Sequence, residues 1–204
     1  MTNAILFIGD SITDAGRRDD PDGLGRGYVR IIAERRGTAF EVVNRGIGGD
    51  RIGDLDARWA EDALAIAPSI LSVFVGINDT WRNYDDGRFT SPELFESTYR
   101  RLLTSSLDAN PALRLILFEP FLLPINEAQT EWTEDLAGKQ RAVATLATEF
   151  GATLVPLQSI LEAAADGSGS GVALGNAEVA HDGVHPTPHG HNVIASAWLE
   201  VAGV

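Results

Sequence analysis

Short apolar runs alternate with longer amphipathic stretches along the chain. The apolar runs are too short for helices and rich in β-branched and aromatic residues, which favours buried strands. These runs lie at 4–8, 40–43, 70–75, 113–118 and 153–155. The amphipathic stretches have the 3.6-residue spacing of helices and begin or end at Gly, Pro or Ser/Thr caps. They lie at 28–36, 55–67, 91–108, 133–150, 157–165 and 187–201.

Strands that are apolar throughout and alternate with helices predict an α/β fold. Such strands are typical of a parallel sheet that helices cover on both faces, joined by right-handed crossovers. The chain shows no internal repeat, and 204 residues suit a single domain spanning 1–204. The Gly- and Ser-rich stretch at 166–171 predicts a flexible surface loop.

Composition narrows the function classes. The chain has no cysteine, which excludes disulfides, a thiol nucleophile and a thiolate metal site. Its net charge of −13 disfavours nucleic acid and anionic membranes as partners. No apolar run approaches the ~20 residues that span a bilayer, and the N-terminus lacks the basic flank of a secretory signal. We therefore expect a cytoplasmic protein, provided that the sequence is complete.

Three predicted strands end in glycine followed by polar residues. The exits are Gly9-Asp10-Ser11, Gly48-Gly49-Asp50 and Gly76-Ile77-Asn78. In a parallel sheet these exits open on the same edge, and ligands of such sheets bind beyond the carboxyl ends of the strands. Their agreement predicts a site at this edge.

The residues available at that edge suit acyl transfer, which needs a nucleophile, a base, a group that orients the base, and donors for an oxyanion. Ser11 follows a buried strand and can attack. The four histidines are His181, His185, His189 and His191. Pro186 disfavours a helix at His185, so Asp182 and His185 are expected in a turn. There the carboxylate can orient the imidazole as a base.

Further residues fill the supporting roles. Three groups are candidate oxyanion donors: the Ser11 N–H, the Gly49 N–H, which no side chain shields, and the Asn78 amide. Trp81 and Tyr84 follow Asn78 and can form an apolar wall for a sugar ring or a small acyl group. Asp10 is placed with the substrate-binding residues, although a loop-supporting or capping role is the simpler interpretation.

The segments Gly9–Thr13, the one around Gly49, Gly76–Asp79 and Asp182–His185 resemble the four sequence blocks of the SGNH hydrolases, or GDSL esterases and lipases. The resemblance implies Ser11, Asp182 and His185 as a catalytic triad, with Ser11, Gly49 and Asn78 as the oxyanion hole. It also implies a three-layer α/β/α sandwich with a five-stranded parallel sheet, the flavodoxin-like SGNH hydrolase fold.

The first block has an isoleucine where the family name has leucine, an apolar exchange. The Gly-x-Ser-x-Gly elbow of α/β-hydrolases is absent. Several stretches, at 43–49, 57–62, 76–84 and 120–121, resemble the intracellular acetyl-xylooligosaccharide esterases within this family.

We therefore expect a serine esterase that hydrolyses short acyl esters, acetyl above all, of a carbohydrate such as acetylated xylo-oligosaccharide. This chemistry requires no metal and no organic cofactor. Self-association is left open. The nearest alternative is an esterase, thioesterase or lysophospholipase for other small acyl substrates.

Two alternatives from other classes stay open. Zinc could be held by Asp182 and the histidines in a metal-dependent hydrolase, although His189 and His191 point to different faces of the last helix. A flavin- or nucleotide-binding module would place a phosphate at the Ser11 loop. Arg51 stands where the dinucleotide fingerprint needs glycine, and such a module gives Asp182 and His185 no role.

Overall fold

The computed structural model describes residues 3–168 and 171–203. Within them, five parallel strands form one sheet in the order β2-β1-β3-β4-β5. The strands are β1 (Ala4–Gly9), β2 (Glu41–Gly46), β3 (Ile70–Phe74), β4 (Arg114–Phe118) and β5 (Thr153–Val155). This is the flavodoxin-like strand order. The connections between strands run one way from β1 to β2 and the other way from β3 to β5, so they change direction between β1 and β3. The expected α/β fold with a five-stranded parallel sheet is confirmed.

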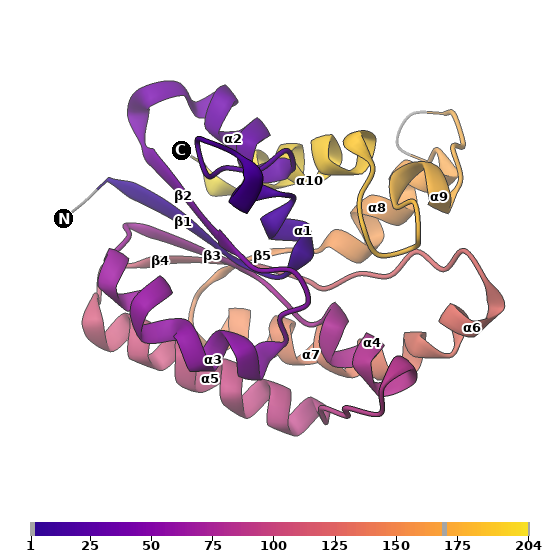
Figure 1. The fold of residues 1–204 in the computed structure, drawn as a ribbon, viewed down its shortest axis with the longest axis horizontal. Coiled ribbons are helices and arrows are strands. Elements are labelled where there is room, and N and C mark those ends of the chain that lie inside the picture. Colours follow the sequence, from indigo (N-terminus) through magenta and orange to yellow (C-terminus); the bar gives the residue numbers. More distant parts are fainter. Residues whose placement is uncertain (1–2, 169–170, 204) are drawn as a thin grey trace.

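Helices cover both faces of this sheet. They are α1 (Ser11–Asp14), α2 (Tyr28–Arg36), α3 (Ile52–Asp62), α4 (Ile77–Asp85), α5 (Pro92–Ala109), α6 (Glu127–Thr130), α7 (Trp132–Glu149), α8 (Leu157–Asp166), α9 (Asn176–Val179) and α10 (Pro188–Ala202). Helices α2, α8 and α10 lie on one side of the strands, and α3, α5 and α7 lie on the other (Figure 1). In the described part of the chain, no helix combines the length and hydrophobicity needed to cross a membrane.

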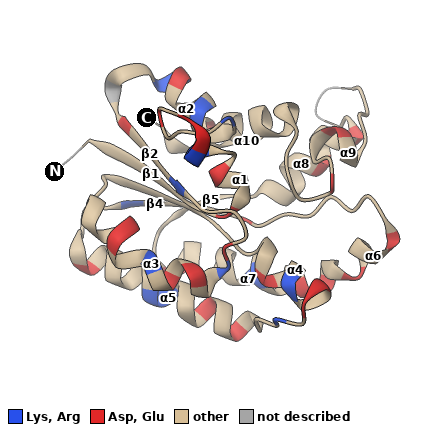
Figure 2. Cartoon of the chain, viewed as in Figure 1, with Lys and Arg blue, Asp and Glu red and all other residues tan. Residues whose placement is uncertain are grey.

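A hydrophobic core lies on each face of the sheet, and alternate side chains of β1 contribute to both cores. Ile5 and Phe7 face the core under α2 and α10, whereas Leu6 and Ile8 face the core under α3, α5 and α7. All four are fully buried, as expected for a strand with helices on both faces. Charged residues lie mostly on the helices and loops, and the strands contain few of them (Figure 2).

Local signals placed the caps of two long helices correctly. The Ser91 hydroxyl accepts a hydrogen bond from the Leu94 amide (3.2 Å), and proline follows at the first helical position of α5. The Thr187 hydroxyl accepts one from the Gly190 amide (3.2 Å) at the start of α10, again with proline next. In both cases the cap satisfies an amide that has no partner within the helix.

The structure differs from the sequence expectations in two segments. Residues 77–85, where the sequence predicted no helix, form helix α4, which begins directly after Gly76 in a backbone conformation with φ +131°. The helix expected over 55–67 is α3, which begins at Ile52, and a separate 3₁₀ turn follows at Leu64–Ile66. The loop expected at 166–171 lies partly outside the described residues, at positions 169–170.

Candidate active site

The exits of β1, β2 and β3 are neighbours at one edge of the sheet, because these strands are adjacent in it. This edge includes the point between β1 and β3 where the connections run in opposite directions, which is where ligands of such sheets bind. The side chains described below come from these exits and from the turn that precedes α10.

Ser11 is the first residue of α1 and follows β1 after one residue. Gly9 permits the close strand packing before it, since a Cβ there would lie 2.0 Å from the Phe74 carbonyl oxygen. The Ser11 side chain opens on a cavity of about 450 Å³. The cavity is lined by Ser11, Asp14, Ala15, Gly16, Arg18 and Asp19. The predicted nucleophile is therefore partly exposed, on a rigid element.

Ser11, His185 and Asp182 are connected by hydrogen bonds. The Ser11 Oγ lies 2.9 Å from His185 Nε2. On the other side of the imidazole, His185 Nδ1 lies 2.6 Å from Asp182 Oδ2. These contacts give the hydroxyl a base within proton-transfer distance and give that base an orienting carboxylate.

The turn around Gly183 fixes the acid and the base relative to each other. Asp182 Oδ1 accepts hydrogen bonds from the amides of Val184 (3.0 Å) and His185 (2.7 Å). Gly183 has φ +85°, and a Cβ there would lie 2.7 Å from Gln129 Oε1, so both backbone and space require glycine. Partial burial raises the pKa of Asp182, but hydrogen bonds from His185 and Val184 outweigh it, and the net shift is downward.

The predicted oxyanion donors lie around the same edge. The amides of Ser11 and Gly49 donate no hydrogen bond to any described part of the chain. Gly49 has φ +88°, and an added Cβ would meet nothing within 4 Å, so backbone conformation, and not space, requires glycine there. Asn78 is buried on the first turn of α4, and its Nδ2 donates to the Asp50 carbonyl (3.2 Å).

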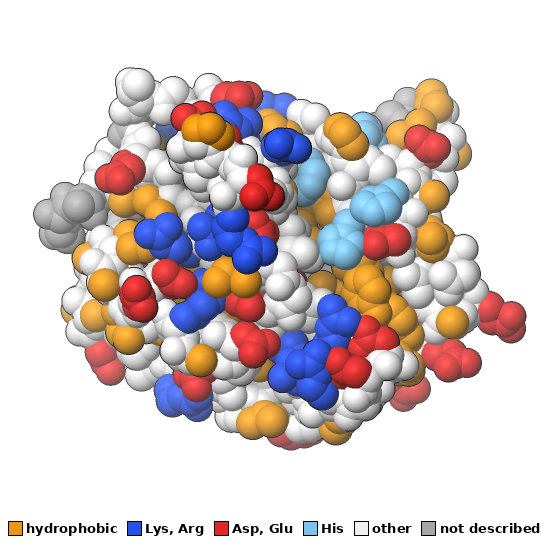
Figure 3. Space-filling view, viewed as in Figure 1, with side chains coloured by type: hydrophobic (Ala, Val, Ile, Leu, Met, Phe, Trp, Pro, Cys, Tyr) orange, Lys and Arg blue, Asp and Glu red, His pale blue; other side chains and the backbone are white. Residues whose placement is uncertain are grey.

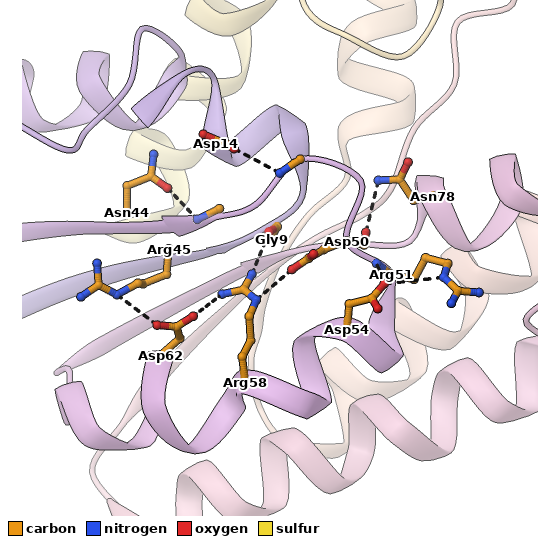
Figure 4. A network of polar contacts seen from close by, with 12 residues as sticks. Gly9, Asp14, Asn44, Arg45, Asp50, Arg51, Asp54, Arg58, Asp62 and Asn78 are labelled. Atoms are coloured by element: carbon orange, nitrogen blue, oxygen red, sulfur yellow. Dashed lines mark hydrogen bonds and ion pairs between the residues drawn. The ribbon is translucent and has the colours of Figure 1, made fainter. Parts of the chain in front are cut away.

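An arginine that sequence reasoning gave no role ties the strand exits together. Arg58 projects from α3 and donates to the Gly9 carbonyl (3.2 Å), Asp50 Oδ2 (2.8 Å) and Asp62 Oδ2 (2.8 Å), as Figure 4 shows. Its side chain is only 15% exposed. The contact with Asp62 has the i,i+4 spacing of one helix, but spacing gave no signal for the contacts with Gly9 and Asp50, which come from the ends of two strands.

An aromatic wall stands beside the imidazole of His185. The Trp81 ring lies 5.9 Å from the His185 ring and 5.5 Å from the Trp132 ring, and Tyr84 stacks on Trp132 at 5.6 Å. The Tyr84 hydroxyl donates to the Glu131 carbonyl (2.9 Å). Figure 3 shows histidine side chains next to hydrophobic ones on this face. Trp81 and Tyr84 thus belong to helix α4, and Trp132 completes the wall.

Sequence reasoning missed Trp132, because it comes from the start of α7, far along the chain from α4. A tryptophan at a helix start is also an ordinary core residue, so its pattern gave no signal.

Asp10 corrects one of the sequence expectations. Its side chain is fully buried, so it offers no surface to a substrate. Its Oδ1 caps α1 by accepting from the Ile12 amide (3.0 Å), while Oδ2 has no hydrogen-bond partner among the described residues. Desolvation, reinforced by the nearby Asp79 and Asp50, raises the pKa of Asp10 to about 7. Asp10 therefore caps α1, and its burial argues against the expected contact with a substrate.

The four histidines do not gather into one cluster. His191 is half-buried, accepts from the Tyr28 amide (3.2 Å), and has a pKa lowered to about 4 by desolvation. His189 is exposed on α10. Among the described residues, donors spaced for a metal are confined to His181, Asp182 and His185. The four-histidine zinc hydrolase therefore has no support in the arrangement of these side chains.

Comparisons with known proteins agree with this fold. Residues 7–193 match the model of the GDSL-like lipase/acylhydrolase family. An acetylxylan esterase of Geobacillus stearothermophilus is 35% identical over 98% of this chain and 93% of its own length. The chain belongs to the GDSL-like lipase/acylhydrolase family, and it is a carboxylic ester hydrolase.

Solved structures extend the likeness to three dimensions. A putative GDSL-like lipase from Parabacteroides merdae has a TM-score of 0.88 at 31% identity, covering 99% of this chain and 96% of its own. A catalytic mutant of Axe2, an acetylxylan esterase from Geobacillus stearothermophilus, has a TM-score of 0.86 at 33% identity, covering 99% and 94%. Catalytic mutants of Axe2 replace a histidine, an aspartate or a serine by alanine.

Proposed function

We propose that this protein removes acetyl groups from esterified carbohydrates, such as acetylated xylo-oligosaccharides, with Ser11 as nucleophile, His185 as base and Asp182 as its orienting acid. The observation that carries the proposal is the continuous chain of contacts, 2.9 Å from Ser11 Oγ to His185 Nε2 and 2.6 Å from His185 Nδ1 to Asp182 Oδ2. Relatives described as acetylxylan and acetyl-xylooligosaccharide esterases support the substrate class.

In the proposed reaction, Ser11 Oγ attacks the ester carbonyl carbon while its proton moves to His185 Nε2. The resulting oxyanion accepts hydrogen bonds from the Ser11 and Gly49 amides and from Asn78. The bond between the carbonyl carbon and the sugar oxygen then breaks as His185 donates the proton to that oxygen, which releases the sugar alcohol and leaves an acetylated Ser11. Water, activated by His185, attacks the acyl group and releases acetate, which restores Ser11.

The surroundings of Ser11 support a small acyl group on a polar alcohol. On one side lies the cavity that includes Asp14, Arg18 and Asp19, whose side chains can bind hydroxyl groups. Beside the His185 ring lies the aromatic wall that includes Trp81 and Trp132. Aromatic faces pack against the apolar faces of sugar rings while polar groups fix orientation. The cytoplasmic location expected from the sequence stays a prediction.

The test compares initial rates on p-nitrophenyl esters of increasing acyl length with acetate release from acetylated xylo-oligosaccharides. Wild-type protein should prefer acetyl esters. Replacing Ser11 by Ala should lower kcat about 10⁴-fold or more, as loss of the nucleophile does in other serine hydrolases. Ser97→Ala, at an exposed serine on α5, is the matched control and should retain wild-type rates. Faster turnover of long-chain esters, or an active Ser11→Ala variant, would contradict the proposal.

A further inference from the structure

The turn that carries His185 carries a second imidazole, which the proposed acyl transfer does not use. The His181 amide donates to the His185 carbonyl (3.0 Å), and Ala180 and Pro186 form an antiparallel bridge next to it. This pairing across the turn holds both imidazoles close together. Their ring centroids lie 5.9 Å apart with an interplanar angle of 24°.

The Asp182 carboxylate has one oxygen directed at both imidazoles. Oδ1 is occupied by the amides of Val184 and His185. Oδ2 lies 2.6 Å from His185 Nδ1 and 3.8 Å from His181 Nε2. One ligand atom from each of His181, Asp182 and His185 lies within 4.8 Å of the others. The His181 side chain is 63% exposed, so an ion can reach this group from solvent.

Two imidazole nitrogens and a carboxylate oxygen form a donor set that zinc accepts, with a fourth position left for water. Zinc ligands sit about 2.0–2.2 Å from the metal, which puts them roughly 3.3 Å apart in a tetrahedral site. The 2.6 Å contact must therefore widen and the 3.8 Å contact must close, both by less than an ångström. The exposed His181 side chain can make the closing movement, and the widening requires a small shift between Asp182 and His185.

We propose that His181, Asp182 and His185 bind one zinc ion and that this binding inhibits the esterase. The inhibitory part rests on the proposed function, whereas the binding part does not. Zinc at His185 Nδ1 displaces the proton there to solvent and takes the Asp182 carboxylate as its own ligand. His185 then loses its orienting acid, and a dication beside the ring opposes the transfer of the serine proton to Nε2.

Calorimetric titration with zinc chloride tests binding without relying on activity. The full chain carrying Ser11→Ala should bind one zinc ion, since all three donors remain. Adding His181→Phe keeps an aromatic ring but removes the nitrogen donor. It should weaken binding about tenfold or more, because even outer-shell partners of metal ligands contribute 10- to 100-fold in affinity. Adding His189→Phe instead, at the exposed histidine of α10, should leave binding unchanged.

Esterase assays at buffered free zinc concentrations test inhibition. Wild type and His189→Phe should be half-inhibited at the same free zinc concentration. His181→Phe should require a concentration at least about tenfold higher. EDTA should restore full activity, whereas a catalytic metal would make EDTA inhibitory. Equal zinc affinity or equal inhibition in wild type and His181→Phe would overturn the proposal. An inactive wild-type protein that still binds zinc through His181 would overturn only the proposed function.

Discussion

Asp10 and Ser11 are adjacent in sequence but lie in opposite environments. Ser11 faces a solvent cavity, whereas Asp10 is fully buried and one of its carboxylate oxygens has no partner among the described residues. A buried carboxyl favours its neutral form, because charge is poorly solvated in the core. Desolvation accordingly raises the pKa of Asp10 and that of the equally buried Asp79 to about 7. The edge of the sheet thus contains two carboxyls that hold protons near neutral pH.

These carboxyls should make stability depend on pH. An unfolded Asp releases its proton near pH 3.9, whereas folded Asp10 keeps it to about pH 7. The folded state therefore binds more protons between these values, so the free energy of unfolding should fall as pH rises through this window. Asp10→Asn keeps the Oδ1 acceptor but never ionises, so its stability should fall less steeply.

Urea unfolding of wild type and Asp10→Asn at pH 5, 6, 7 and 8 measures this slope. The control variant is Asp22→Asn, at an exposed aspartate, and it should show the same slope as wild type. Parallel curves for wild type and Asp10→Asn would show that Asp10 does not carry a shifted proton.

At the scale of elements, α3 acts on the site through one side chain. Arg58 bonds to the end of β1 at Gly9 and to Asp50 in the exit of β2. These two exits carry Ser11 and Gly49, so a single guanidinium sets their spacing. Desolvation raises the pKa of the Asp50 carboxyl, and the ion pair with Arg58 opposes this rise. The charged form of Asp50 is therefore stabilised by Arg58. Arg58 is a positioning residue, because it does not face the cavity beside Ser11.

Arg58→Met should lower kcat for p-nitrophenyl acetate about 10- to 100-fold and change KM less, since displacement of about 1 Å at a reacting centre costs up to 100-fold. Circular dichroism checks that the fold persists. Arg101→Met, at an exposed arginine of α5 paired with Asp56, is the control and should keep wild-type kinetics. A smaller drop in Arg58→Lys than in Arg58→Met would support positioning by charge. An unchanged kcat in Arg58→Met would remove Arg58 from this role.

At the scale of the whole molecule, β1 and β3 are the strands that are paired on both sides and buried throughout. Strand β1 pairs with β2 on one side and β3 on the other, and all six of its residues are buried. The edge strand β5 has three residues and one neighbour. Residues 171–175, before α9, are exposed. Buried, doubly paired backbone opens only with much of the structure, whereas exposed segments open locally.

Hydrogen exchange followed by mass spectrometry should reproduce this order. Peptides covering β1 and β3 should exchange more slowly, by orders of magnitude, than peptides covering 171–175, with β5 in between. Exchange in β1 as fast as in 171–175 would mean that the sheet is not the stable centre of the molecule.

The sequence predicted elements whose signals are local and missed those that depend on distant partners. The strand at Thr153–Val155 and the caps Ser91 and Thr187 were predicted as observed, because hydrophobic runs and capping groups act within a few residues. Helix α4 was missed, since Gly76 and Asn78 are typical of loops. The burial of Asp10 and the roles of Arg58 and Trp132 depend on contacts with other elements.

The sequence alone determined the class of fold, because continuously apolar strands that alternate with amphipathic helices can bury their faces only in a covered parallel sheet. It also placed the polar strand exits at one edge. Tertiary structure decided which side chains meet there. Ser11 and His185 are separated by 174 positions, yet their side chains lie 2.9 Å apart, because the order of strands brings α1 against the turn before α10. No local pattern encodes such a distance, since it arises only when the whole chain packs.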